Sequence, residues 1–462
     1  MANVIFIALI LLSIYAFISK NENYIYIFMF LYPILPEYFA ISLGGALPIL
    51  TASRCLIILL FIFTLLKYKK INFKALKDTK FLKVLLIYFI FETANFVVHN
   101  SISENLKEYI GIILENIVFI FIVCMNIDTQ EKKEKCIKML VYASGVVGVF
   151  ALLEPFLGIN VAEFLDTGAS DSVLKIAYVR LGMYRATFSF GHPICLAVYC
   201  IMIMPITMYC IQKYNKFIFK VIFCLNILTV FLTISRGQIL IGMLLLVMIF
   251  ITMKKDEKRK YYSLIFIAIV VIILGFMFSE KLRNNFQSIA YSVLNTFGLN
   301  LEVDNFGENE NALGRLDQLS MIGQVLDKYP LFGGGEEYIR RNPVYITRAD
   351  GTTFVAVSVD CEYISFLLNK GILGFLVNIY IYIFTLKLYL KSKNKTSLSR
   401  ALFFSALGAM MCYVTVNQLT TNRIFWIIIC LTIIEAFQSK KAKEEEELKK
   451  LKEVGKAEEN IE

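Results

Sequence analysis

The stretch GHPICLAVYCIMIMPITMYCI, residues 191–211, decides the class of fold. It contains no Lys, Arg, Asp or Glu, and a lysine-bearing loop at 213–220 follows it closely. An apolar run of about 20 residues is long enough to cross a bilayer as a helix. The stretch is therefore predicted to be a transmembrane helix that ends at a charged loop.

The same pattern recurs along the chain of 462 residues. Hydrophobic residues make up 58% of the sequence and charged residues only 18%, whereas a soluble domain of this length needs more charge to cover its surface. We predict further spans near 81–98, 107–126, 137–157, 218–234, 238–253, 262–279, 363–386, 400–417 and 424–437. The predicted fold class is all-α: a polytopic transmembrane helical bundle of 12–14 spans with one large outer loop.

The number of spans before Lys67 is left open. The run at 4–19 has no basic residue before it and no small-residue cleavage pattern after it, so we expect a retained span rather than a signal peptide. Residues 24–50 contain three prolines and two adjacent glycines. They are compatible with one broken span, two short spans or a re-entrant hairpin.

Lysine-rich loops predict the orientation of the chain. They lie at 67–83, 131–138, 213–220, 254–260, 387–400 and after 439, and such loops face the cytoplasm. The long loop at 280–362 carries 12 acidic residues against 2 Lys and 5 Arg, which agrees with an external position in a multi-pass protein of the cytoplasmic (inner) membrane. The predicted regions are N-terminal spans (1–157), central spans (158–279) with an outer loop at 158–190, the large external loop (280–362), C-terminal spans (363–437) and a charged cytoplasmic tail (438–462).

Cysteine and charge distributions exclude two other classes of protein. Most of the ten cysteines fall inside apolar runs, with no CxxC pair or metal-type spacing, so they are expected to be buried apolar residues. A formal net charge of +10 can indicate nucleic-acid binding, but here the lysines sit in short loops between spans. We therefore expect no nucleic-acid partner.

The 12 arginines do not follow the lysines. Arg259 and Arg400 lie in predicted inside loops, and Arg54 is ambiguous. The other nine map to the predicted outer face, the reverse of the positive-inside rule: Arg180, Arg185, Arg236, Arg283, Arg315, Arg340, Arg341, Arg348 and Arg423. Guanidinium groups bind phosphate oxygens bidentately. We interpret the pattern as an external pocket for a phosphorylated anion.

Arg236 is the sharpest of these candidates. It lies in the turn TISRG, residues 233–237, between two apolar spans with almost no loop. A cation at membrane depth is costly unless it is paired or lines a cavity, so it marks a functional site by default. The alternative is an arginine whose head reaches the membrane interface.

Four segments in order complete the pattern. They are RATFSFGHP (185–193), TISRG (233–237), Gly314-Arg315 followed by KYPLFGGG (328–335), and VDCEY (359–363) leading to GILG (371–374). Together they resemble the O-antigen polymerase and ligase family (Wzy and WaaL proteins) over roughly residues 180–440. The family shows an Arg before a Gly-His-Pro turn, a Ser-Arg-Gly turn, a Gly-Arg start to a large periplasmic loop and a Pro-Leu-Gly-Gly element.

The resemblance implies a metal-independent membrane glycosyltransferase that uses no cofactor. Such an enzyme takes a glycan from undecaprenyl diphosphate on the outer leaflet and joins it to an acceptor hydroxyl. Arg185, Arg236 and Arg315 match family arginines that are thought to hold the diphosphate. The remaining substrate-binding candidates are Arg180, His192 and Tyr363, and His192 serves either chemistry or the start of a helix. No DxD motif or His cluster suggests a metal site.

The candidates for the catalytic base are Asp360 and Glu362. Ligases of the family carry His-Asn at the end of the large loop, where this sequence has Asp360-Cys361, and this difference disfavours a ligase. A partly buried carboxylate with a raised pKa can take the acceptor proton. Position favours Asp360. If the segment is extended, both side chains point the same way, and if it is already helical they diverge.

We expect a surface polysaccharide or O-antigen polymerase. It joins oligosaccharide repeat units that are carried on undecaprenyl diphosphate at the outer face of the membrane, where membrane lipid surrounds the protein. A ligase that transfers the glycan to another acceptor is the first alternative, and a polysaccharide flippase or other transporter is the second. A transporter should show a repeat of spans and little extramembrane mass, and neither is visible. A polymerase is expected to work beside a flippase and a chain-length regulator.

Overall fold

The computed structural model describes residues 2–459 except 20–22, 43, 45–47, 69–71, 100–102, 170–177, 181–182, 279–317, 348–352, 357, 391–395 and 418. The N-terminal half contains α1 (Ala2–Ser19), α2 (Tyr24–Ile34), β1 (Ala40–Ile41), β2 (Leu50–Thr51), α3 (Ala52–Lys67), α4 (Lys74–Asp78), α5 (Phe81–Val98), α6 (Ser103–Ile112), the π-helical turn η1 (Ile113–Val118), α7 (Phe119–Asn126), α8 (Gln130–Leu157), η2 (Val161–Leu165), β3 (Val179–Arg180), β4 (Met183–Tyr184), η4 (Phe188–Phe190) and α9 (Pro193–Tyr214). The C-terminal half contains α10 (Phe217–Leu232), α11 (Arg236–Thr252), α12 (Lys255–Phe278), α15 (Ser320–Leu326), α16 (Tyr338–Arg341), β5 (Val344–Thr347), β6 (Thr353–Ala356), α17 (Glu362–Leu390), α18 (Ser397–Cys412), η5 (Leu419–Thr421) and α19 (Asn422–Glu459).

The all-α polytopic fold predicted from the sequence is confirmed. Among the described residues, six helices are long and apolar enough to cross a membrane, and four shorter helices are also apolar. Sheet is confined there to three two-stranded antiparallel hairpins. The predicted span at 81–98 coincides with α5, and the one at 191–211 is α9, shifted by two or three residues at each end.

The segment 24–50 forms one helix followed by a short hairpin. The helix α2 ends at Ile34, one residue after Pro33, and the chain then turns into β1, which pairs with β2. The amide of Ala52 donates to the carbonyl of Phe39, so the hairpin is fastened directly to the start of α3. The three arrangements considered from the sequence did not include a β-hairpin, because a paired strand of two residues leaves no periodic signal.

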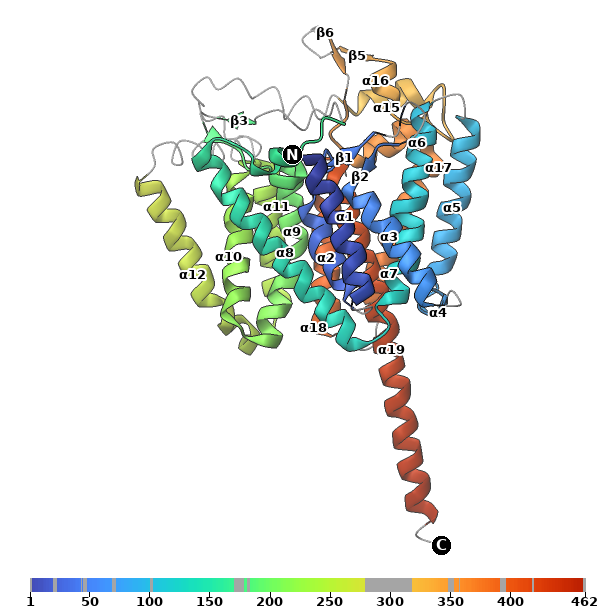
Figure 1. Cartoon of the computed structure of the whole chain (residues 1–462), viewed down its shortest axis with the longest axis vertical. Coiled ribbons are helices and arrows are strands. Elements are labelled where there is room, and N and C mark those ends of the chain that lie inside the picture. The colour runs from blue at the N-terminus through green and yellow to red at the C-terminus, as the bar shows by residue number, and fades with distance from the viewer. Residues whose placement is uncertain are drawn as a thin grey trace.

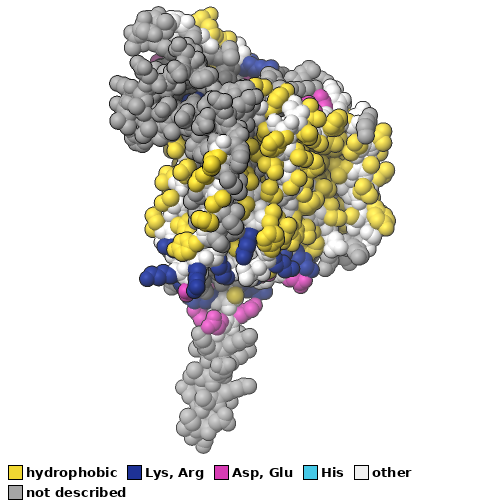
Figure 2. Space-filling model, turned by 90° about the vertical axis from the view of Figure 1, so that its left-hand side faces the viewer, with side chains coloured by type: hydrophobic (Ala, Val, Ile, Leu, Met, Phe, Trp, Pro, Cys, Tyr) yellow, Lys and Arg dark blue, Asp and Glu magenta, His cyan; other side chains and the backbone are white. Residues whose placement is uncertain are grey.

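The helices form a bundle whose two ends differ (Figure 1). The hairpins β1–β2, β3–β4 and β5–β6 lie at one end with α15 and α16, and the C-terminal part of α19 projects from the other end. On the face shown in Figure 2, hydrophobic side chains cover the body between the two ends, and Lys and Arg gather at the edge above the projecting helix. This distribution is the one expected of a protein that spans a membrane many times.

Among the six long apolar helices, α9 is the most enclosed. In its apolar stretch of 18 residues, 94% of the residues are buried. It packs against α18, α10, α11 and α8. A helix that is apolar all round belongs in the interior, where every face finds a neighbour. The stretch that decides the class of fold is thus also the centre of its core.

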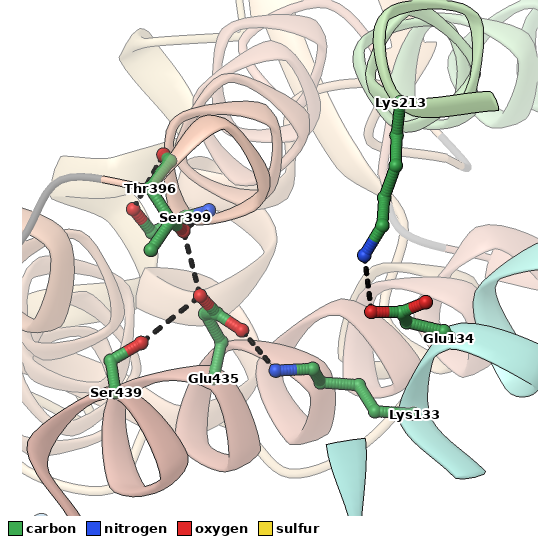
Figure 3. A network of polar contacts seen from close by, with 7 residues as sticks. All are labelled: Lys133, Glu134, Lys213, Thr396, Ser399, Glu435 and Ser439. Carbon is green, nitrogen blue, oxygen red and sulfur yellow. Dashed lines mark hydrogen bonds and ion pairs between the residues drawn. The ribbon is translucent and has the colours of Figure 1, made fainter. Parts of the chain in front are cut away.

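A buried ion pair joins three helices at the lysine-rich end of the bundle (Figure 3). Lys133 of α8 donates to Glu435 of α19, and both side chains are almost fully buried. The second carboxylate oxygen of Glu435 accepts from Thr396, which caps α18, at 2.7 Å, and from Ser439 at 3.1 Å. Nearby, Lys213 at the end of α9 pairs with Glu134 of α8.

At the opposite end, the segment KYPLFGGG is fastened to a kink in α17. Gly371 has φ 66° and ψ −168° inside this helix, which interrupts the regular backbone pattern. The amides of Gly334 and Gly335 donate to the carbonyls of Leu368 and Asn369, at 2.8 and 3.0 Å. In return, the amide of Ile372 donates to the carbonyl of Pro330 at 2.9 Å. Two motifs that are separate in the sequence are therefore one structural unit.

Candidate functional site

A polar cavity of about 540 Å³ lies between the helices at the hairpin-bearing end. Its lining combines charged side chains with amides and aromatic rings. The residues that line it include Glu37, Ser53, Arg54, Tyr88, Glu108, Glu115, Asn116, Glu336, Glu337, Glu362, Asn369, Lys370, Tyr382, Asn417, Asn422, Arg423 and Trp426. A cavity of this size and polarity is the usual form of a small-molecule site.

One wall of the cavity is built by the α6–η1–α7 helix. Its π-helical turn carries Glu115 and Asn116, and π turns inside helices are frequent at functional sites. Nε of Arg54 donates to Glu115 at 2.8 Å, and Nη1 of the same arginine donates to the carbonyl of Ile49 at 2.8 Å. Arg54, which the sequence left ambiguous, is therefore a paired cation of the cavity.

The opposite wall is the first half of α17, which begins at Glu362. The Glu362 side chain is buried, and its amide donates to the carbonyl of Tyr413 at 3.0 Å. Two turns further on, Nζ of Lys370 donates to Glu92 of α5 at 2.8 Å, and both side chains are buried. The helix thus brings a carboxylate and a paired ammonium group to the same cavity.

Two carboxylates that line the cavity from connecting segments, Glu37 and Glu336, have a raised pKa. Burial raises the pKa of Glu336 to about 8, and the neighbouring carboxylate of Glu108 adds to the effect. Burial also raises the pKa of Glu37, partly offset by Arg423. Both groups lie in connecting segments outside the spans, and Glu336 can carry a proton at neutral pH.

Arg423 reaches the cavity from the first turn of α19. Its Nη1 donates to the carbonyl of Leu35 at 2.7 Å and to Oγ of Ser53 at 2.9 Å. The guanidinium also lies over the rings of Tyr32 and Phe190. Nε and Nη2 are buried and have no hydrogen-bond partner among the described residues.

A second cluster, which we call the arginine cluster, consists of Arg185, Ser235 and Arg236. Nε of Arg185 donates to the carbonyl of Thr233 at 2.7 Å, and its Nη2 donates to Oγ of Ser235 at 3.0 Å. Ser235 is the N-cap of α11, and Arg236 is the first residue of that helix. The structure therefore brings together two of the predicted motifs, RATFSFGHP and TISRG.

Glu154 at the end of α8 holds the backbone that follows Arg185. Its two carboxylate oxygens accept the amides of Thr187 and Phe188, each at 2.6 Å. His192 then caps α9, because its Nδ1 accepts the amide of Ile194 at 3.2 Å. Burial and the neighbouring Arg185 lower the pKa of His192 to about 4, so the imidazole is neutral at physiological pH.

The arginine cluster and the cavity are joined by the turn after α18, residues 413–417. On one side of this turn, Nε2 of Gln238 donates to Oγ1 of Thr415 at 2.9 Å, two residues after Arg236. On the other side, the carbonyl of Tyr413 accepts the amide of Glu362. Asn417, at the end of the turn, lines the cavity and donates to the carbonyl of Val359 at 3.3 Å.

The predicted site residues differ in how they relate to the cavity. Glu362 lines it, whereas Asp360 is exposed, its amide donating to Gln318 at 3.2 Å. Since α17 begins at Glu362, Asp360 lies before the helix, and the two carboxylates have different surroundings. The hydroxyl of Tyr363 donates to the carbonyl of Met410 at 2.7 Å, in the packed interior.

Several predicted residues cannot be placed in either site. Arg180 forms part of β3, but its side chain lies outside the described residues, as do Arg283, Arg315 and Arg348. Arg340 is exposed and pairs with Glu337.

Sequence reasoning missed two cations of the cavity, Arg54 and Lys370, and it placed Arg423 among the outer-face arginines without selecting it as a site residue. A signal was present, because Glu92, Glu115 and Lys370 are charges within apolar runs, and such charges usually mark a functional site.

Known families were compared with the chain, and no curated protein matches it. Residues 221–379 match the family Wzy_C, described as O-Antigen ligase. The matched segment contains Ser235 and Arg236 of the arginine cluster and, at its other end, Glu362 and Lys370 of the cavity. Over these residues, about a third of its length, the chain is similar to the O-antigen ligase family, and its apolar helices are those of a multi-pass membrane protein.

Proposed function

We propose that the chain is an O-antigen-type polymerase that joins oligosaccharide repeat units carried on undecaprenyl diphosphate, at the outer face of the cytoplasmic membrane. The observation that carries the proposal is the turn at 413–417, which contacts Gln238 beside Arg236 on one side and Glu362 on the other. A site for an anionic leaving group and a carboxylate in a polar cavity are thus held by the same short segment.

The proposed reaction uses these two parts in one displacement. A hydroxyl oxygen of the acceptor forms a bond to the anomeric carbon of the donor, and the bond from that carbon to the diphosphate oxygen breaks. The diphosphate leaves with the electron pair, and the acceptor proton passes to Glu362. Fixed guanidinium groups at Arg185 and Arg236 stabilise the charge that grows on the leaving group. The chain's own residues thereby supply both the base and the charge stabilisation.

Buried in the cavity wall, Glu362 is better placed for the base than Asp360, which is exposed. A general base must reach the proton that it removes, and a side chain in the cavity wall can meet an acceptor hydroxyl bound there. Asp360 provides the natural control, because it lies two residues away in the same motif.

The experiment measures elongation of lipid-linked repeat units by the purified full-length protein. We expect Glu362→Gln to accumulate single repeat units and Asp360→Asn to elongate them at close to the wild-type rate. Arg236→Lys should also lose most of the activity, because a lysine keeps the charge but not the bidentate geometry. Arg340→Lys, at an exposed arginine, should have no effect. Normal elongation by Glu362→Gln together with loss in Asp360→Asn would assign the base to Asp360 instead.

A ligase is the second candidate, since the matched family is described as O-Antigen ligase. The same preparation distinguishes the two. A polymerase lengthens lipid-linked chains when they are the only substrate, whereas a ligase consumes them only after a separate acceptor is added. Absence of any transfer under both conditions, in protein that remains folded, would contradict the proposed function.

A further inference from the structure

Glu336 is held in the cavity wall by contacts to its backbone from two sides. Its amide donates to Oδ1 of Asn105 in α6 at 2.6 Å, and its carbonyl accepts from Nη2 of Arg341 in α16 at 2.9 Å. Asn105 is itself fixed, because its Nδ2 donates to the carbonyl of His99 at 3.0 Å. Nε2 of His99 lies 3.1 Å from the carbonyl oxygen of Gly333 in the same glycine-rich segment. The half-buried side chain of Glu336, which lines the cavity, therefore starts from a fixed point.

The other charged groups around Glu336 come from three further helices. They are Glu108 of α6, Glu92 of α5, and Lys370 and Glu362 of α17. Nζ of Lys370 donates to Glu92 at 2.8 Å, so the ammonium among these four groups is already paired. With one cation against three carboxylates among them, a further negative charge at Glu336 is disfavoured.

The pKa of Glu336 agrees with this arrangement. Burial is the largest cause that raises it to about 8, and the charge of Glu108 adds to the effect, partly offset by Lys370. A group with a pKa of about 8 is mostly protonated at neutral pH and loses its proton as the pH rises through that value. Glu336 is therefore an O–H donor at neutral pH and a charged acceptor in alkaline solution.

Donors are scarcer than acceptors among the charged groups of the cavity. Six of the residues that line it are glutamates, and the cations Arg54 and Lys370 are already engaged by carboxylates. Sugar hydroxyls both donate and accept, whereas the ring and glycosidic oxygens of a sugar only accept. A glycan bound against this wall requires a donor beside the carboxylates. A carboxylic acid that stays protonated at neutral pH supplies one.

Aromatic surface lies in the same cavity. Tyr88 of α5 and Trp426 of α19 both line it, and their ring centroids are 5.9 Å apart. Such rings offer the apolar surface on which the C–H face of a sugar packs. Trp426 is also the one tryptophan of the sequence, so the tryptophan fluorescence of the protein reports on this cavity.

We propose that Glu336 enters the cavity as a neutral carboxylic acid and donates a hydrogen bond to an oxygen of the acceptor glycan. This inference rests on the proposed function for the identity of the ligand, and it names a residue that sets the affinity for that ligand. Glu336 acts in binding, whereas Glu362 takes the proton of the reacting hydroxyl. The affinity for the glycan falls in alkaline solution, because an ionised Glu336 no longer donates.

The first experiment follows the fluorescence of Trp426 in the purified full-length protein as a probe is added. The probe is the free oligosaccharide repeat unit, released from its lipid by mild acid, so that it carries no diphosphate. We expect it to bind about tenfold more weakly at about pH 9.5 than at about pH 7, because one hydrogen bond is lost. Equal affinity at the two pH values would overturn the proposal, and so would the absence of binding at both.

Variants of Glu336 show whether the pH dependence belongs to this residue. Glu336→Gln carries a neutral amide donor at every pH, so its affinity should be the same at about pH 7 and about pH 9.5. Glu336→Ala should bind about tenfold more weakly than Glu336→Gln at about pH 7, because it has no donor. Asp327→Asn, at an exposed acidic residue after α15, is the control and should keep the wild-type dependence on pH.

Two results with these variants would overturn the proposal. One is a Glu336→Gln protein that still binds more weakly in alkaline solution, and the other is a Glu336→Gln protein that binds no better than Glu336→Ala. If neither variant folds, the wild-type comparison of the two pH values decides it.

Elongation assays on the same preparation separate this proposal from the proposed function. Binding that weakens in alkaline solution, in a wild-type protein that shows no transfer, would contradict the proposed function and leave the role of Glu336 standing. Transfer by a protein whose binding is independent of pH would overturn the role of Glu336 alone.

Discussion

Gly333 packs its backbone directly against Gly371 at the kink of α17. A Cβ on Gly371 would lie 2.4 Å from the carbonyl oxygen of Leu331 and 2.5 Å from the amide nitrogen of Gly333. Both glycines have positive φ angles, near 66°, which other L-residues rarely adopt. Glycine is therefore required at each of the two positions by conformation and by space.

We expect Gly371→Ala to destabilise the protein by at least about 2 kcal/mol, from the left-handed backbone and the overlap together. Loss of elongation should accompany it, because the kink follows Lys370 in the cavity wall. Thermal unfolding in detergent measures the first effect. Gly323→Ala is the matched control, since a Cβ there meets nothing within 4 Å. Equal melting temperatures for the two variants would show that the close approach is not required.

Glu154 is expected to act as a positioning residue for Arg185. In Glu154→Gln, the NH₂ of the amide would face a backbone N–H that the carboxylate now accepts at 2.6 Å. We expect a loss of about 1–3 kcal/mol of stability and a lower rate of elongation. Glu163→Gln, a nearby exposed residue, should behave as wild type. If Glu154→Gln has the wild-type rate and melting temperature, the carboxylate does not position this turn.

The Lys133–Glu435 pair offers a test of how the lysine-rich end is held together. Glu435→Gln leaves Lys133 buried without its counter-charge, so we expect a loss of about 3–5 kcal/mol. The double substitution Lys133→Met with Glu435→Leu should recover most of this loss, because no uncompensated charge remains. Glu445→Gln, which breaks the exposed pair with Lys441, should change the melting temperature very little. A double variant no better than Glu435→Gln would show that the hydrogen bonds from Thr396 and Ser439 dominate instead.

The orientation in the membrane can be tested by cysteine labelling. Asn342 lies at the hairpin-bearing end and Lys255 at the lysine-rich end, and both are exposed. A membrane-impermeant thiol reagent should label Asn342→Cys in intact cells and Lys255→Cys only after lysis, as the lysine distribution predicts. The native cysteines provide the background measurement, and most of them are buried. The opposite pattern of labelling would reverse the predicted orientation.

Much of the fold was predictable because the length of an apolar run is a direct physical requirement of the bilayer. The start of α5 at Phe81 and that of α17 at Glu362 follow from where such runs begin. The pairing of Arg185 with Ser235 was approached through motifs that resemble a known family. The docking of Gly333 on Gly371 was not predictable, because it depends on backbone atoms that leave no periodic pattern.

The cavity was harder to predict than the spans. Glu115 reaches it through a π-helical turn, and Arg423 through the first turn of a helix that directly follows the short 3-10 helix η5. Neither position follows from helical periodicity alone. Charged residues within apolar runs gave the best available signal. Two of them, Glu92 and Lys370, form a buried ion pair in the structure, and Lys370 lines the cavity.

The π-helical turn at Ile113–Val118 has a consequence for how this wall can vary. A π turn contains one residue more than the α-helical turn it replaces, so it is equivalent to a single-residue insertion in a helix. Deletion of one residue within it would restore α-helical register and rotate α6 by about 100° relative to α7. Glu108 would then face a different neighbour, while α7 could keep its packing against α3 and α19. Deletion of a single codon would therefore replace one set of side chains on this wall by another, which no single substitution can do.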